Sequence, residues 1–249
     1  MDQLTGKNFS NVRYEIQEGR LTMLGTRSYL IVNFIYSIIV MGISLAVANA
    51  NTIGWATLSN NWHVIYYIEA VLLILQILLI LFCWAQTPFN QKILSLSRVI
   101  YTYKVALDPF IMIMMFAKDS GIYDSFAPLL LFIIAIGLLI HILVFMKLIK
   151  DLKKDHHNRK VKRLKSKMLI LVIFVLVIIT TIIFRSGLLK DLELLFMLFA
   201  FTIVYIGMLI GVCEFIIAAY CIFRYPSFSV NSPPKQQYVN KMKKRKRKK

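Results

Sequence analysis

The side chains with the clearest chemical potential lie inside apolar segments, where charged groups are costly and tend to face other protein rather than lipid. Lys104 and Asp108 are four residues apart, so on a helix they share one face and can form an ion pair. Pro109 follows directly. Because proline cannot donate a backbone hydrogen bond and its ring crowds the preceding turn, we expect it to kink the helix beside the pair.

Three more ionisable side chains lie in other apolar segments: Glu69, His141 and Glu214. If helices brought all five groups together, they would form a ladder across the membrane. Glu69 would be its outer end, Lys104 and Asp108 its centre, and His141 and Glu214 its inner end. Proton relays in transporters use such groups. The simpler alternative is a structural ion pair between Lys104 and Asp108, with Glu69 and Glu214 neutral or directed towards an interface.

No catalytic motif accompanies these groups. The sequence contains no GxxxxGK[ST], HExxH, GxSxG or Gly-rich dinucleotide turn. His156 and His157 are adjacent in a basic stretch without a third ligand nearby, so we interpret them as a solvated pair. Cys83, Cys213 and Cys221 lie in apolar runs without metal-ligand or CxxC spacing, which makes disulfides unexpected. We therefore predict no catalytic residue, no metal and no cofactor.

The elements that must position these groups are membrane-spanning helices. The chain has 249 residues, of which 58% are hydrophobic, and soluble globular proteins contain about 45–50%. Its apolar runs approach or exceed the ~20 residues that a helix needs to cross a bilayer. The predicted spans are residues 29–48, 64–85, 93–116, 126–149, 168–184 and 192–223. The predicted fold class is all-α, a polytopic integral membrane bundle of six transmembrane helices with both termini cytoplasmic (N-in/C-in).

Positive charge is concentrated in alternate gaps between these spans. The chain has 30 Lys and Arg against 12 Asp and Glu, a formal net charge of +18. Four of the basic residues lie in residues 1–28, ten in residues 147–167 and ten in residues 224–249. Two more, Lys92 and Arg98, lie in the stretch that follows the second apolar run. Cytoplasmic loops carry such an excess of Lys and Arg, so the pattern predicts the orientation.

The third predicted span, residues 93–116, has a weaker apolar pattern than the others. It contains Arg98, Lys104, Asp108 and Pro109, and hydropathy alone scores it poorly. With six spans, 26 of the 30 Lys and Arg lie on the cytoplasmic side. If this segment did not cross, one of the two ten-charge stretches would lie outside, against the positive-inside bias. We therefore predict that it crosses.

Residues 1–28 form a polar cytoplasmic segment before the first span. Val12, Tyr14 and Ile16 alternate with polar residues, and Gly19 offers a turn, a pattern typical of a short β-hairpin. An isolated hairpin is marginally stable in water. We expect it to pack on the cytoplasmic loops or on a partner.

Two features indicate contacts with other molecules. Gly207 and Gly211 form a GxxxG motif in the last span, which we interpret first as packing within the bundle and second as a dimer contact. The basic residues at the end of the tail are Lys241, Lys243, Lys244, Arg245, Lys246, Arg247, Lys248 and Lys249. We expect the tail and residues 147–167 to contact anionic lipid headgroups. An acidic partner or RNA is the alternative, and no specific nucleic acid is expected.

Two function classes fit the sequence. The first is a non-catalytic multi-pass membrane protein that acts through protein–protein or protein–lipid interaction, such as an accessory subunit of a membrane or secretion complex or a toxin-immunity protein. The second is a small proton- or ion-coupled transporter or channel that uses the five ionisable intramembrane groups. An enzyme acting on a lipid-soluble substrate ranks third. The Ile- and Lys-rich composition suits an AT-rich bacterial genome, so we expect a bacterial cell membrane.

Overall fold

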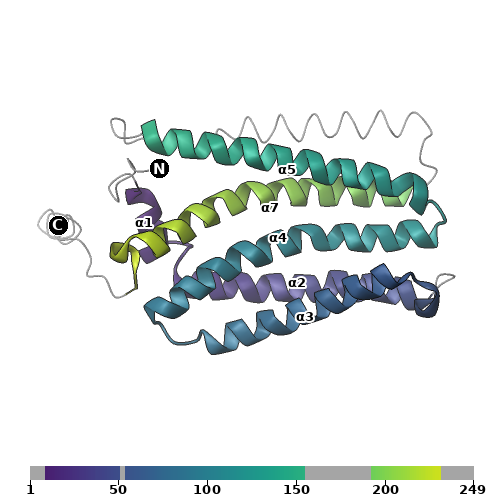
Figure 1. The fold of residues 1–249 in the computed structure, drawn as a ribbon, viewed down its shortest axis with the longest axis horizontal. Helices are drawn as coiled ribbons and strands as arrows, with labels where there is room; N and C mark the ends of the chain where they lie inside the picture. The colour runs from purple at the N-terminus through teal and green to yellow at the C-terminus, as the bar shows by residue number, and fades with distance from the viewer. Residues whose placement is uncertain (1–8, 51–53, 155–191, 231–249) are drawn as a thin grey trace, which may run out of the picture.

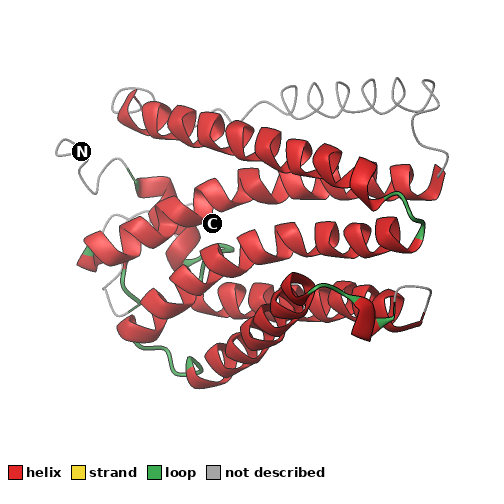
Figure 2. Ribbon diagram, turned by 45° about the vertical axis from the view of Figure 1, so that its right-hand side comes forward, coloured by secondary structure: helices red, strands yellow, loops and turns green. Residues whose placement is uncertain are grey.

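The computed structural model describes residues 9–50, 54–154 and 192–230. These residues form helices and loops and contain no strand (Figure 2). The long helices are α2 (Met23–Ala50), α3 (Asn60–Phe82), α4 (Pro88–Asp119), α5 (Tyr123–Lys154) and α7 (Leu192–Arg224). A short helix, α1 (Ser10–Gln17), precedes them, and the short 3-10 turns Trp55–Thr57 and Pro226–Phe228 lie in the connections. The long helices lie side by side along the long axis of the molecule (Figure 1).

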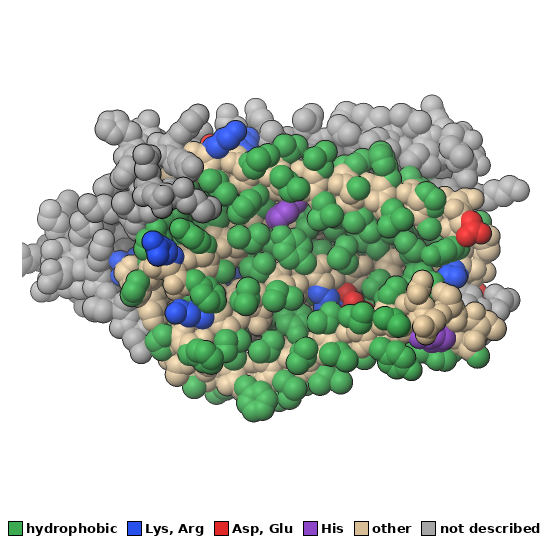
Figure 3. Space-filling model, viewed as in Figure 1, with side chains coloured by type: hydrophobic (Ala, Val, Ile, Leu, Met, Phe, Trp, Pro, Cys, Tyr) green, Lys and Arg blue, Asp and Glu red, His purple; other side chains and the backbone are tan. Residues whose placement is uncertain are grey.

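Five of the described helices are long and apolar enough to cross a membrane. They correspond to the predicted spans 29–48, 64–85, 93–116, 126–149 and 192–223, so the all-α class is confirmed over the described residues, and the length and composition of these helices are compatible with a membrane protein. Hydrophobic side chains cover much of the flank in view, and most of its Lys and Arg lie towards the end that holds α1 (Figure 3). The predicted span at 168–184 lies outside the described residues.

α4 is the central helix of the described bundle. It packs against α2, α3, α5 and α7, and it lies between α7 and α2 in Figure 1. Buried residues make up 61% of its most apolar stretch, against 17% in α3 and in α5. Because its neighbours are helices rather than lipid, α4 carries polar side chains that a lipid-facing helix excludes. This explains why its hydropathy is the lowest of the five. The helix continues through Pro109 without interruption.

The N-terminal segment is helical, so the predicted β-hairpin is wrong over the described residues. α1 places Val12 and Ile16 on one face, together with Phe9 just before the helix. Phe9 and Ile16 are buried against the end of α7, in a cluster that includes Phe215. Phe9, Val12 and Ile16 stand at positions i, i+3 and i+7, which lie on one face of a helix. Because Val12 and Ile16 are four residues apart, their spacing also fits the two-residue period of a strand, so the pattern by itself does not distinguish the two. Packing against α7 favours the helix.

Candidate functional site

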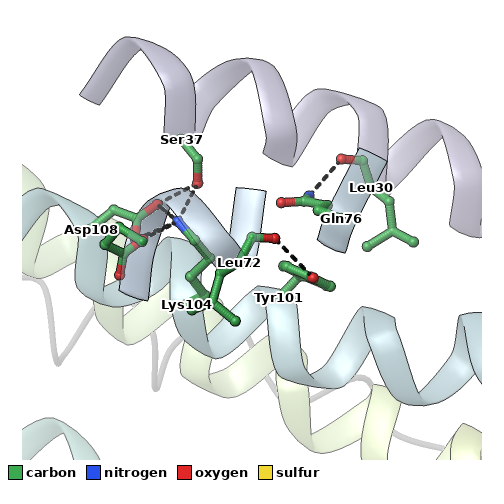
Figure 4. Close-up of polar contacts among 8 residues, drawn as sticks. Leu30, Ser37, Leu72, Gln76, Tyr101, Lys104 and Asp108 are labelled. Carbon is green, nitrogen blue, oxygen red and sulfur yellow. Dashed lines mark hydrogen bonds and ion pairs between the residues drawn. The ribbon is translucent and has the colours of Figure 1, made fainter. Parts of the chain in front are cut away.

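A buried cluster of charges lies where α2, α3 and α4 meet. Lys104 Nζ lies 2.6 Å from Glu69 Oε2 and donates to Asp108 Oδ1 and Oδ2 at 3.0 and 2.9 Å. It also lies 3.1 Å from Ser37 Oγ, and Ser37 Oγ donates to Asp108. Figure 4 shows Ser37, Lys104 and Asp108 pointing towards one another from α2 and α4. We call Glu69, Lys104 and Asp108 the charged triad.

Helix geometry explains how the triad assembles. Lys104 and Asp108 lie one turn apart on α4, and the predicted pair forms. Ser37, Glu69 and Lys104 each lie near the middle of their helices, which places the triad at mid-depth of the bundle. Glu69 is therefore not a separate outer group, because α3 begins at Asn60, before the predicted start at residue 64, and carries Glu69 to the depth of Lys104.

The triad holds two carboxylates and one ammonium. With all three groups ionised it has a net charge of one negative unit in a place shielded from water, since Lys104 and Asp108 are buried and the Glu69 side chain is 12% exposed. Lys104 donates hydrogen bonds to Asp108 and Ser37 and forms an ion pair with Glu69, whose Oε2 has no hydrogen-bond partner among the described residues. The site can therefore join three helices through one ammonium, or hold an exchangeable proton on one of its acids.

Polar side chains continue along the inner face of α2. The buried polar residues that follow one another on this face are Thr26, Asn33, Ser37 and Ser44. Ser44 Oγ lies 2.6 Å from the Tyr66 hydroxyl of α3. Gln76 Nε2 donates to the Leu30 carbonyl at 2.9 Å (Figure 4). The sequence interpretation missed these groups. The polar residues of α2 are spaced by four and seven residues, and this spacing could have identified them because it places them on one helix face.

His141 lies in a separate polar site between α5, α4 and α7. Its Nδ1 is 2.7 Å from the Leu209 carbonyl oxygen, and because a carbonyl only accepts, this nitrogen carries a proton. Its Nε2 is 2.7 Å from the Tyr103 hydroxyl. Tyr103 and Lys104 are neighbours in α4, and adjacent helical side chains diverge by about 100°. His141 therefore faces a different side of α4 from the triad.

Glu214 lies at the end of the bundle near α1, where it forms an ion pair with Arg20. The two side chains are 50% and 62% exposed, so this pair lies on the surface. The nearby guanidinium of Arg98 lies over the ring of Phe215, with its carbon 3.9 Å from the ring centroid. The five ionisable candidates thus divide into three separate groups, the triad, the site of His141 and the pair of Glu214. The structure does not join them in one ladder.

Among the described glycines, Gly137 is the one whose added Cβ would meet the nearest atom. The two glycines of the predicted GxxxG motif have no such close neighbour. A Cβ added to Gly207 or Gly211 would meet no atom within 4 Å. These glycines therefore provide no close contact among the described helices. Packing against the span at 168–184, which lies outside the described residues, and a dimer contact stay predictions. A Cβ on Gly137 of α5 would lie 2.1 Å from Cε1 of Tyr205 in α7. The absence of a side chain at Gly137 is what allows the Tyr205 ring to lie against α5.

The basic segments lie mostly outside the described residues. α5 continues as a helix to Lys154, into the basic stretch 147–167. The remainder of that stretch, with His156 and His157, is outside the described part of the chain, as is the tail 241–249 with all eight of its basic side chains.

The arrangement of ligand-type side chains does not indicate a metal centre in the part of the chain that the structure describes. No three His, Cys, Asp or Glu side chains gather there as a metal ion would require. Cys83, Cys213 and Cys221 are free thiols. Comparisons of this chain with protein-family models, with curated proteins and with solved structures found no match.

Proposed function

We propose that the protein is a six-span membrane protein of the bacterial cell membrane with both termini in the cytoplasm. Five described helices and the apolar run at 168–184 supply the six spans. The alternating Lys and Arg content supports the orientation. Single cysteines introduced at residues 120 and 227, in a background without the native thiols, test this topology. An impermeant maleimide applied to intact cells should label residue 120 and leave residue 227 unlabelled, and the reverse result would overturn the orientation.

Within that topology, we propose that the protein acts through interaction, with another membrane protein or with anionic lipid, and has no catalytic activity of its own. The observation that carries this proposal is the separation of the intramembrane polar groups. The triad, the site of His141 and the Glu214–Arg20 pair lie on different helix faces, and each group finds its partners within its own site. Such closed sites are suited to holding a bundle together. The basic loop and tail are then the surfaces available for binding.

The test is a pull-down of the tagged full-length protein from its native membrane, followed by mass spectrometry. A variant with Gln at every Lys and Arg of residues 241–249 should lose a stoichiometric partner or its enrichment of anionic lipid. The matched control is Glu69→Gln with Lys104→Met and Asp108→Asn, which removes the triad charges and should keep the partner. Loss in the control alone, with retention in the tail variant, would overturn the proposal.

A second candidate function, proton- or ion-coupled transport, is favoured by one observation. The triad has one more carboxylate than it has cations, so an exchangeable proton on Asp108 or Glu69 would balance its charge. In proteoliposomes containing a pH dye, this function predicts proton flux that Asp108→Asn abolishes. The substitution His141→Gln, in a site away from the triad, should leave such flux unchanged. Absence of flux with every candidate substrate tested would favour the interaction role.

A further inference from the structure

Among the described residues, Arg27 is a buried cation without an anionic partner. It lies in the first turns of α2, and only 7% of its surface is exposed. Its Nε and Nη2 atoms are buried and have no hydrogen-bond partner among the described residues. One contact is an aromatic ring, with the guanidinium carbon 5.2 Å from the centroid of Trp84. A buried charge without a counter-charge is costly, so this position calls for an acceptor.

Two other arginines at this end of the bundle, Arg98 and Arg20, make polar contacts. Arg98 lies over the rings of Tyr29 and Phe215 and donates to the Arg20 carbonyl at 3.3 Å. Arg20 pairs with a surface carboxylate. No described carboxylate pairs with Arg27 in this way. Arg98 Nε is likewise buried without a hydrogen-bond partner, so what sets Arg27 apart among the described residues is that both donors of one guanidinium edge, Nε and Nη2, are unsatisfied.

The unpartnered atoms have the geometry of a phosphate-binding edge. Nε and Nη2 are the two adjacent donors along one side of the guanidinium plane, and such an edge binds two oxygens of a phosphate or carboxylate side by side. The Trp84 ring contributes a further contact of cation–π type to the same guanidinium. Trp84 is itself 66% exposed, so its ring can turn to admit an anion while it stays beside the guanidinium.

The depth of Arg27 fits a lipid headgroup. Ser37, beside the triad, lies near the middle of α2, and Arg27 is ten residues before it. At about 1.5 Å per residue this places Arg27 about 15 Å from the mid-plane. The hydrocarbon core is about 30 Å thick, so its boundary lies at the same depth. Trp84 follows the end of α3, where tryptophan is typical of the interface.

We propose that Arg27 and Trp84 form a binding site for the phosphate of an anionic glycerophospholipid, at the end of the bundle that carries α1. The guanidinium edge binds two phosphate oxygens, and the indole covers the headgroup from the lipid side. This site is separate from the basic tail. It supplies the acceptor that the described protein residues do not provide.

The test uses the full-length protein in detergent and native mass spectrometry with added phosphatidylglycerol. The wild type should retain a lipid that Arg27→Gln binds at least about tenfold more weakly. Arg27→Lys, which keeps the charge without the two-donor edge, should fall between them. The matched control is Arg224→Gln, an exposed arginine at the end of α7, which should bind as the wild type does. Size-exclusion chromatography first checks that each variant elutes at the volume of the wild type. If Arg27→Gln fails to fold, the comparison of wild type with Arg27→Lys is the test.

The remaining arms identify the source of the phosphate. Phosphatidylcholine, which has no net negative charge, should bind more weakly than phosphatidylglycerol to the wild type. Deleting residues 241–249 should leave the difference between wild type and Arg27→Gln intact. If inorganic phosphate at millimolar concentration displaces the lipid completely, the lipid source is overturned in favour of free phosphate. If Arg27→Gln and Arg224→Gln bind phosphatidylglycerol equally, the site itself is overturned.

Discussion

Replacing Lys104 by Met tests how much the charged triad stabilises the bundle. The ammonium lies 2.6 Å from Glu69 and 2.9 Å from Asp108. At an effective dielectric constant of about 20, each such pair attracts by roughly 6 kcal/mol. Desolvation of the charges offsets much of this gain, and removing one partner of a buried pair costs about 3–5 kcal/mol because the remaining charge has no counter-ion. We expect Lys104→Met to lower the free energy of unfolding by about 3–5 kcal/mol.

Two further variants separate charge from packing. Glu69→Gln with Lys104→Met and Asp108→Asn removes all three charges and leaves no uncompensated carboxylate. Because neutral replacement of a buried ion pair is often close to neutral in stability, we expect this triple variant to recover most of the loss. Lys92→Met makes the same substitution near the start of α4, where the lysine contacts only a ring within the described structure at 5.7 Å. It should cost less than about 1 kcal/mol.

The assay is equilibrium unfolding of the full-length protein in mixed micelles at pH 7, followed by tryptophan fluorescence. Equal stability of Lys104→Met and Lys92→Met would refute the reasoning, because the triad would then contribute nothing that a half-buried lysine outside the triad does not. A triple variant as unstable as Lys104→Met would show instead that lost side-chain contacts, rather than unpaired charges, cause the effect.

Three other outcomes follow from the structure. Gly137→Ala should lower the melting temperature, because its Cβ would meet Tyr205 and overpacking costs about 1–3 kcal/mol. Gly207→Ala should leave the melting temperature nearly unchanged. A larger decrease for Gly207→Ala than for Gly137→Ala would contradict the described packing. His141→Phe should cost about 1–3 kcal/mol in denaturant titrations, because it leaves buried polar partners unsatisfied; no measurable cost would mean that these hydrogen bonds are not formed in the membrane protein. Cys83 is buried, so in a variant with only this cysteine, maleimide labelling of the folded protein should be much slower than labelling of Ser120→Cys in the same background. Equal labelling rates would contradict the burial.

Sequence periodicity and composition were sufficient to predict those features of the fold that depend only on residues close together in the chain. The length of the apolar runs predicted the five described long helices, since the bilayer sets that length. The pairing of Lys104 with Asp108 was also predictable, because one helical turn separates them whatever surrounds the helix. The positive-inside bias of Lys and Arg placed residues 93–116 among the predicted spans, although this segment is the least apolar of the five described helices.

Contacts between helices were decided by the tertiary structure alone. Spans that are apolar on every side carry little signal of which face meets which neighbour. For this reason Glu69 joined the triad while His141 and Glu214 did not, and Gly137 rather than Gly207 became the close contact. The N-terminal helix likewise depends on burial of Phe9 and Ile16 against α7, more than 190 residues away in the sequence. Local sequence sets the helices and their depth, and packing between distant residues sets which side chains meet.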